Sequence, residues 1–492
     1  MLKRIAVAGM ATVLSLALGA TAAQGATVAG LAKQSPARKV TAIVQFKPGF
    51  SERKAKTLVA AHGGKVTSRV PLIHGLAVRL PAKQAAKLAR ERQVVGLTLN
   101  SRVHGTAIED GALAARFPKS INADKVWRRG YTGKGVGVAV IDTGIAGDAV
   151  DFKDASGNSR VIANAITAKG ATTAGDGFGH GTHVAGIIAG NSLNRPAGDP
   201  LRGKYIGVAP DANLIAVKAS DEAGNSTVLD VINGIQFVVD HKAEFNIRVL
   251  NLSVSSDTPQ SYKLDPLNAA VEYAWQKGIV VVAASGNRGA APDAVKFSPG
   301  NDPFVISVGG VDEEGNYGRG SRAVWSSTGR TQDGFMKPDV MAPGAHIVSV
   351  LAPSSAFQAL CANCAIGGAY FKAGGTSMAA PVVAGAAALL LQARPTLTPD
   401  QVKTILMQTD KPIHGQAGAG EIDVERALYT STGYTNVNRG LVPNLLIQAL
   451  NRVGADLAQW SRSSWSAAKG SLAAGWARSS WSCHGCEASS SA

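Results

Sequence analysis

Three residues that could carry out acyl transfer stand in separate stretches of the sequence. Asp142 closes the apolar stretch GVAVID, His180 follows glycines in DGFGHGTHVAG, and Ser377 lies in AGGTSMAAP. A serine hydroxyl is a weak nucleophile near neutral pH, so it needs a neutral imidazole to take its proton and a carboxylate to orient that imidazole. The order Asp, His, Ser is a known triad order and differs from that of the α/β-hydrolases.

A fourth residue could stabilise the negative charge that develops on a substrate carbonyl. Asn287 ends the stretch AASGN, where its side-chain amide could donate to an oxyanion. A lone Asp or Ser in such a place is more often a turn former or a helix cap, so the prediction rests on all four motifs in order. His183 follows His180 by three residues, but no acidic residue lies between them as in a zinc-binding H-E-x-x-H motif. We therefore expect His183 to be structural.

Apolar runs that alternate with helical stretches predict an α/β fold with a parallel sheet from about Gly135 onward. The expected strands are VGVAVID, LIAVKAS, IRVLNLSV, GIVVVAASGN, FVISVGGV and HIVSVLA, and the expected helices include HVAGIIAG and DVINGIQFVVDHKA. In open parallel sheets, functional residues gather at the carboxyl ends of the strands. Asp142 and Asn287 follow such strands.

The other two candidates are expected at the starts of helices. A helix that begins at His180 has a dipole that favours the neutral imidazole which a base requires. Ser377 stands just before the apolar run VVAGAAALLLQ, and Pro381 is tolerated there if it falls in the first helical turn.

The four motifs together resemble the subtilisin-like serine proteases, the subtilase family, over roughly residues 120–430. They are VAVIDTGI, GHGTHVAG, AASGN and GGTSMAAP. The resemblance implies that Asp142 is the orienting acid, His180 the general base and acid, Ser377 the nucleophile and Asn287 the oxyanion donor. It also implies a serine endopeptidase that hydrolyses proteins or peptides through an acyl-enzyme and requires no cofactor.

The same resemblance implies two segments that pair with an extended peptide as an added strand. They are Gly224, Asn225 and Ser226 on one side, and Ser253, Val254 and Ser255 on the other. Arg288 would lie near the rim of the S1 pocket, and Phe297 replaces a small residue common at its floor, so the P1 preference stays open. Asp151 resembles a calcium-ligating aspartate, although the companion loop is replaced by NSLNRPAGDPLRGKY. A structural calcium ion is possible, and we expect no catalytic metal.

The N-terminus has the pattern of a secretory signal. MLKR precedes the apolar stretch IAVAGMATVLSLALGA, and small residues follow, so a signal peptide over residues 1–25 could be cut after Ala22 or Gly25. A membrane anchor is the alternative, but this stretch is short, and no later segment reaches ~18 apolar residues without a charge or a proline. The sequence therefore predicts a secreted, extracellular protein with no membrane span after signal removal.

Residues 38–104 predict a small separate domain. Their strands and helices follow the order βαββαβ, as in a ferredoxin-like unit. By resemblance this unit is the inhibitor propeptide that accompanies the family, which makes the chain a zymogen. Residues 101–110 would then contain or adjoin the scissile bond.

The net charge of +16 is spread very unevenly along the chain. Residues 1–100 hold 16 Lys and Arg against Glu52 and Glu91, whereas residues 101–492 hold 34 basic and 32 acidic residues. A nearly neutral body without a nucleic-acid-binding motif does not predict a nucleic-acid partner.

We place the catalytic domain at residues 115–432 and a Ser/Trp-rich tail, expected to lie outside the core, at residues 433–492. The four cysteines form two C-x-x-C pairs, Cys361 with Cys364 and Cys483 with Cys486. The 118 residues from 365 to 482 separate them too widely for a usual zinc ribbon. Export favours disulfides, and a bridge within C-x-x-C closes a very short loop. We therefore hypothesise that the tail cysteines pair with Cys361 and Cys364.

An alternative of a different class is a catalytically silent extracellular binding module, with the tail as its adhesive part. The presence of all four candidate catalytic residues argues against it.

Overall fold

The computed structural model describes residues 35–100, 102–104, 115–313, 320–415, 418–431 and 436–453. The expected signal peptide, Cys483, Cys486 and most of the expected cleavage segment lie outside these residues.

A twisted sheet in the order β14-β13-β12-β10-β6-β8-β7, with β17 paired to β13, forms the centre of the catalytic part. All of its strand pairs are parallel except that between β13 and β14. Its strands are β6 (Gly137–Asp142), β7 (Val161–Ile166), β8 (Asn213–Lys218), β10 (Ile247–Leu252), β12 (Val280–Ala284), β13 (Ile306–Asp312), β14 (Ser321–Arg322) and β17 (Val340–Pro343). Strands β6 and β12 are buried along their whole length, because helices cover both faces of the sheet.

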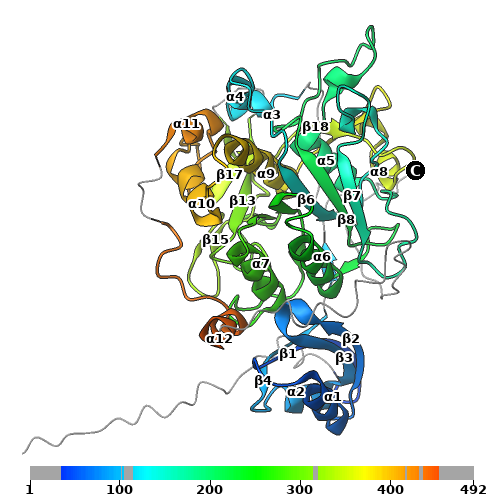
Figure 1. Ribbon diagram of the computed structural model, residues 1–492, viewed down its shortest axis with the longest axis vertical. Coiled ribbons are helices and arrows are strands. Elements are labelled where there is room, and N and C mark those ends of the chain that lie inside the picture. The colour runs from blue at the N-terminus through cyan, green and yellow to red at the C-terminus, as the bar shows by residue number, and fades with distance from the viewer. Residues whose placement is uncertain are drawn as a thin grey trace, which may run out of the picture.

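Figure 1 shows the helices α5 (His180–Ala189) and α9 (Thr376–Ala393) on one side of the sheet, and α6 (Val228–Asp240) and α7 (Pro266–Gln276) on the other. The N-terminus of α6 is fixed by a capping box between Thr227 and Asp230. By length and composition α9 could cross a membrane, but 89% of its apolar window is buried inside the protein, which is typical of a core helix. Further helices of this part are α3 (Phe117–Ser120), α4 (Ala123–Trp127), α10 (Pro399–Gln408) and α11 (Val424–Tyr429).

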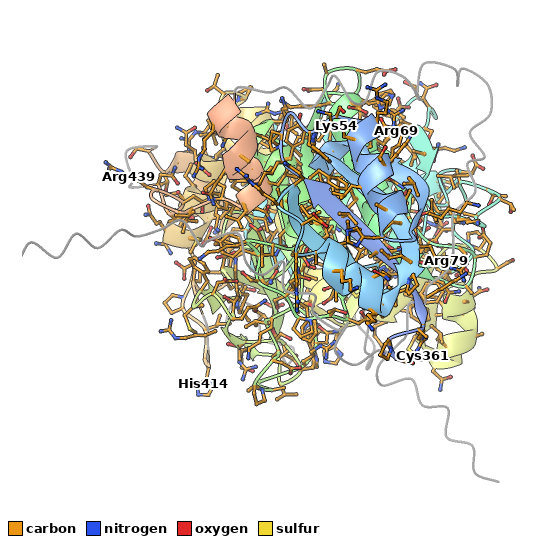
Figure 2. The ribbon with its side chains drawn as sticks, turned by 90° about the horizontal axis from the view of Figure 1, so that it is seen from below. Lys54, Arg69, Arg79, Cys361, His414 and Arg439 are labelled. Carbon is orange, nitrogen blue, oxygen red and sulfur yellow. A yellow bond between two sulfur atoms is a disulfide. The ribbon has the colours of Figure 1, made fainter. Side chains whose placement is uncertain are left out.

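The N-terminal unit has the predicted order βαββαβ and lies below α6 and α7 in Figure 1. Its antiparallel sheet has the order β2-β3-β1-β4. Its elements are β1 (Lys39–Phe46), α1 (Glu52–Ala61), β2 (Lys65–Val70), η2 (Pro71–Ile73), β3 (Gly75–Pro81), α2 (Ala82–Leu88) and β4 (Val94–Leu99). Figure 2 looks onto this basic unit from below, with Lys54, Arg69 and Arg79 labelled. Leu72 and Ile73 join the core of the catalytic part instead of the unit's own core.

The prediction that HIVSVLA belongs to the parallel sheet is wrong. Its strand β18 (Ile347–Val350) pairs antiparallel with β20 (Tyr370–Ala373), which also pairs with β19 (Ala365–Ile366). An apolar run gives no direction of pairing, and here the chain turns back within about twenty residues, which permits an antiparallel partner. A second small antiparallel pair consists of β15 (Gly329–Arg330) and β16 (Met336–Lys337).

The prediction that the chain leaves the core after residue 432 is wrong for residues 436–453. Helix α12 (Leu445–Val453) buries Leu446, Ile447 and Leu450 in the main core. Just before it, the backbone N–H of Asn444 donates to Glu272 Oε2 at 2.8 Å. The residues from 454 onward lie outside the described part of the chain.

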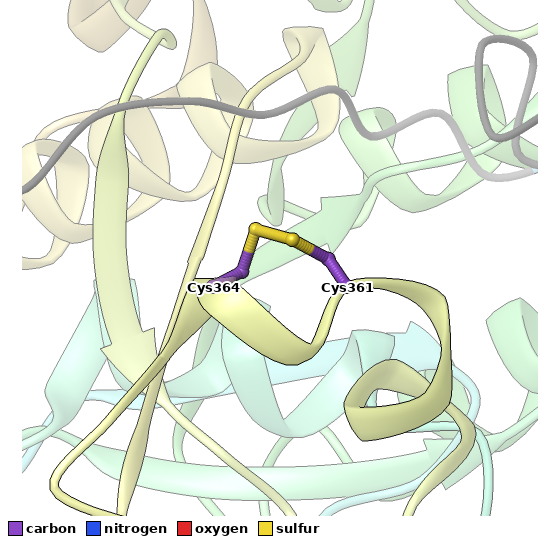
Figure 3. The surroundings of a disulfide bond; sticks show 2 residues. All are labelled: Cys361 and Cys364. Atoms are coloured by element: carbon purple, nitrogen blue, oxygen red, sulfur yellow. A yellow bond between two sulfur atoms is a disulfide. The ribbon is translucent and has the colours of Figure 1, made fainter. Parts of the chain in front are cut away.

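The hypothesis that the tail cysteines pair with Cys361 and Cys364 is contradicted as well. The structure joins these two residues to each other, between the end of α8 (Ala356–Leu360) and η5 (Ala362–Cys364) (Figure 3). The chain turns so tightly there that the two Cα atoms are 5.3 Å apart, a normal separation for a disulfide.

Candidate active site

A buried hydrogen bond joins the first two predicted site residues. Asp142 is the last residue of β6, and His180 is the first residue of α5. His180 Nδ1 lies 2.7 Å from Asp142 Oδ1, and the two residues are 2% and 0% exposed. A carboxylate in this place accepts the Nδ1–H, so the lone pair of the neutral ring lies on Nε2. That tautomer is the one a general base requires.

The loop before His180 is held by a residue that the sequence analysis missed. The buried side chain of Asp176 accepts four hydrogen bonds of 2.7–2.8 Å through its two oxygens. The donors are the Gly179 N–H, the Thr143 hydroxyl, and both the N–H and the hydroxyl of Thr182. Burial raises the pKa of Asp176, and these donors oppose that shift. In the sequence, Asp176 stands four residues before the helix that begins at His180, with glycines between them. This position was the signal that could have identified Asp176.

Ser377 is the second residue of α9 and is fully buried. The expectation that Pro381 falls in the first turn of this helix is wrong, because Pro381 is the sixth residue of α9 and lies inside it. Ser377 forms two hydrogen bonds with Ser253. Its Oγ donates to the Ser253 carbonyl at 3.2 Å, and its own carbonyl accepts from Ser253 Oγ at 2.8 Å.

Asn287 lies beside the start of the same helix. Its Oδ1 accepts from the backbone N–H of Thr376 at 3.0 Å and from the Thr376 hydroxyl at 2.9 Å. These bonds fix which end of the amide faces Thr376. Its Nδ2 is buried and has no hydrogen-bond partner among the described residues. The amide of Asn287 is thus held against Thr376, the residue before Ser377, and its buried, unpaired N–H2 group is available to donate to an oxyanion.

A strand of the chain itself lies between the two predicted peptide-binding segments. Strand β5 (Arg102–His104) lies between β9 (Ser226–Thr227) and β11 (Ser255–Ser256) and pairs antiparallel with both. Val103 is opposite Ser226, and His104 is opposite Ser255. An extended peptide is therefore accommodated between these two segments as an added strand.

The other four predicted substrate-binding residues do not pair with β5 in this way. Gly224 and Asn225 belong to a turn in which Asp221 accepts from both the backbone N–H and the side chain of Asn225. Val254 is buried, and Ser253 contacts Ser377 as described above.

Comparison with known proteins identifies the family. The model of the subtilase family matches residues 133–441. The chain belongs to this family.

Several relatives agree with this assignment. "Serine protease AprX" of Bacillus subtilis is 35% identical over 410 residues, which cover 80% of this chain and 88% of the relative. "Subtilisin E" of the same organism is 33% identical over 398 residues, which cover 78% and 89%. This protein is accordingly a subtilisin-like serine endopeptidase that acts on protein or peptide substrates.

A solved structure supports the fold. Fervidolysin from Fervidobacterium pennivorans, described as a keratinolytic enzyme related to subtilisin, matches with a TM-score of 0.63 and 23% identity. The match covers 81% of this chain and 62% of fervidolysin.

In this subtilase, Arg288 covers Phe297. The Arg288 guanidinium carbon lies 3.8 Å from the centroid of the Phe297 ring, and Phe297 is buried without belonging to either main hydrophobic cluster of the described residues. The residue next to Phe297 in the chain, Ser298, is tied to β11, because the backbone N–H of Ser256 donates to its carbonyl at 2.7 Å. The Arg288 and Phe297 pair therefore lies between the oxyanion candidate Asn287 and β11.

His183 is structural, as the sequence predicted. It is fully buried, its Nε2 lies 2.9 Å from the Phe371 carbonyl oxygen, and burial lowers its pKa to about 3. The ring is therefore neutral near neutral pH.

The carboxylate of Asp151 is already engaged by protein groups. Its Oδ1 accepts from the Tyr370 hydroxyl at 2.5 Å, and its Oδ2 pairs with Arg195 at 3.2 Å. Arg195 belongs to the long loop NSLNRPAGDPLRGKY, which replaces the companion loop of a calcium site. Its guanidinium supplies the positive charge next to the Asp151 carboxylate. These residues do not fit a calcium ion. Within the described ranges, no cluster of three or more His, Cys, Asp or Glu side chains could hold a metal.

Proposed function

We propose that this subtilase is an exported serine endopeptidase, made as a zymogen, in which Asp142, His180 and Ser377 form the catalytic triad. The observation that carries the proposal is the buried 2.7 Å contact between His180 Nδ1 and Asp142 Oδ1, at the end of a central strand. A buried imidazole paired in this way to a carboxylate has the orientation and tautomer of a general base.

In the proposed reaction His180 takes the proton of the Ser377 hydroxyl as that oxygen attacks the substrate carbonyl. Asp142 stabilises the imidazolium that forms, and Asn287 Nδ2 donates to the oxyanion. His180 then protonates the leaving amine, and a water molecule hydrolyses the acyl-enzyme by the same route in reverse.

We propose that residues 38–104 form an inhibitor propeptide. The support is the position of β5 between β9 and β11, where a substrate strand would pair. His104 is opposite Ser255 in an antiparallel pair. If a bound peptide continues in this register, its second residue after His104 is opposite Ser253, whose carbonyl accepts from Ser377 Oγ. A peptide bound in this register would present Thr106 to the nucleophile, so we expect the scissile bond directly after Thr106.

Export of the chain rests on its predicted signal peptide, over residues 1–25, together with its membership of the subtilase family. We accordingly propose that the mature enzyme acts outside the cell.

Labelling with a fluorophosphonate probe tests the catalytic assignment. We expect the purified mature enzyme, freed of residues 38–104, to be labelled on Ser377 and to hydrolyse a peptide amide, and Ser377→Ala to do neither. A folded protein that takes up no label and cleaves no peptide after removal of residues 38–104 would instead support the alternative of a silent binding module.

A further inference from the structure

The position of Pro381 creates a specific problem for the nucleophile. In an α-helix, the N–H of residue 381 would donate to the carbonyl of residue 377. Proline has no N–H, so the regular bond to the Ser377 carbonyl cannot form inside α9. The backbone of the proposed nucleophile thus lacks the contact that normally holds the first turn of a helix.

A side chain from outside the helix supplies the missing donor. Ser253 Oγ donates to the Ser377 carbonyl at 2.8 Å. Ser253 follows β10 directly, on the substrate side of the cleft, so its hydroxyl ties α9 to the segment that faces the peptide.

The direction of that hydroxyl is itself determined. Asn251 Nδ2 lies 2.9 Å from Ser253 Oγ and donates to it. An amide N–H2 can only donate, so the single proton of the Ser253 hydroxyl points to the other neighbour, the Ser377 carbonyl. All three residues are fully buried, so water does not compete for these bonds.

We propose that the Ser253 hydroxyl, oriented by Asn251, is a positioning group that holds the Ser377 backbone for attack and replaces the helical bond removed by Pro381. This inference rests on the proposed role of Ser377 as nucleophile. It assigns to Ser253 a function of its side chain, distinct from peptide pairing by its backbone.

The test is a double-mutant cycle. Ser253→Ala should lower kcat about 10-fold with little change in KM, because the lost hydrogen bond positions the nucleophile and does not hold the substrate. Adding Pro381→Ala to Ser253→Ala gives residue 381 an N–H that can bond the Ser377 carbonyl within the helix. The double variant should recover most of the lost kcat. Ser253→Thr, which keeps a hydroxyl, should stay within about 3-fold of the parent.

A matched control separates positioning from stability. Thr409→Val removes another buried hydroxyl, directly after α10, that donates to the Ile405 carbonyl at 2.7 Å, and it should leave kcat unchanged. If Ser253→Ala does not fold, Asn251→Ala serves instead, because it leaves the hydroxyl in place without its orienting donor, and Pro381→Ala should rescue it in the same way.

The outcomes are distinct. No fluorophosphonate labelling of the folded parental enzyme, after the N-terminal unit has been cut off and digested, would refute the proposed function itself. A labelled, active parent with an equally active Ser253→Ala, or a folded double variant with no recovery of kcat, would overturn the positioning role alone.

Discussion

The buried carboxylate of Asp176 offers a direct test of how the loop before His180 is held. In Asp176→Asn, one oxygen can still accept from Thr143 and Gly179, but an amide N–H2 faces the Thr182 N–H. One buried backbone donor then has no acceptor, which costs about 1–3 kcal/mol. Asp176→Ala removes the acceptor of all four bonds, and at about 1–1.5 kcal/mol each the cost is roughly 4–6 kcal/mol.

The measurement is the thermal midpoint in a Ser377→Ala background, which prevents self-digestion during heating. We expect a decrease for Asp176→Asn and a clearly larger one for Asp176→Ala. In the active background, fluorophosphonate labelling should slow in the same order, because Thr182 and Gly179 flank His180 in the chain. Asp154→Asn is the control, since Asp154 also accepts backbone N–H bonds but lies in an exposed turn. Equal midpoints for Asp176→Ala and the control would refute the network.

Three further predictions concern the reaction. Asn287→Ala should lower kcat by roughly 10²- to 10³-fold at similar KM, the loss known for this donor in subtilisin itself, and a smaller effect in steady-state kinetics would exclude it as the oxyanion donor. N-terminal sequencing of the secreted enzyme should show a cut after Thr106, whereas purified Ser377→Ala should stay uncut, and its efficient processing would rule out self-cleavage. Phe297→Gly should raise kcat/KM for P1 Phe over P1 Ala peptides by roughly 10-fold or more, and an unchanged ratio would show that the ring does not limit the S1 pocket.

The sequence predicted the parts of the site that depend on local structure. Asp142 ends an apolar strand and His180 follows glycines at a helix start, and each motif determines its own backbone position within a few residues. Once both lie at the same edge of a parallel sheet, their contact follows from the topology.

Contacts between distant segments could not be predicted. Ser253 reaches the Ser377 carbonyl across 124 residues of sequence, and no local pattern indicates that Pro381 needs such a partner. The cysteine pairing failed for a related reason, because the turn that brings Cys361 and Cys364 together depends on how the loop between β18 and β20 folds.

The C-terminal boundary could have been predicted better. Composition changes near residue 432, and this change obscured the pattern LLIQALNRV, whose apolar residues recur at helical spacing on one face. That face packs against α7 and buries Leu446 and Ile447. The change in composition therefore placed the end of the catalytic domain about twenty residues too early.

The contacts of the N-terminal unit with the catalytic part determine whether a cut after β5 releases the unit. Leu72 and Ile73 insert into the catalytic core, the Thr98 hydroxyl donates to Gln260 Oε1 at 2.6 Å, and Asn100 Oδ1 accepts from the backbone of α6. All of these contacts, and β5 itself, precede the expected cut, so cleavage leaves them intact.

We therefore expect the severed unit to remain bound and to inhibit until it is itself digested. The contacts named above join apolar or uncharged groups of the unit to the catalytic part. Salt screens ion pairs far more than apolar or neutral contacts, so the inhibition should persist in about 1 M NaCl. Peptide hydrolysis by the freshly cut complex tests this, and full activity appearing on addition of salt alone would show that the unit's excess positive charge holds it in place.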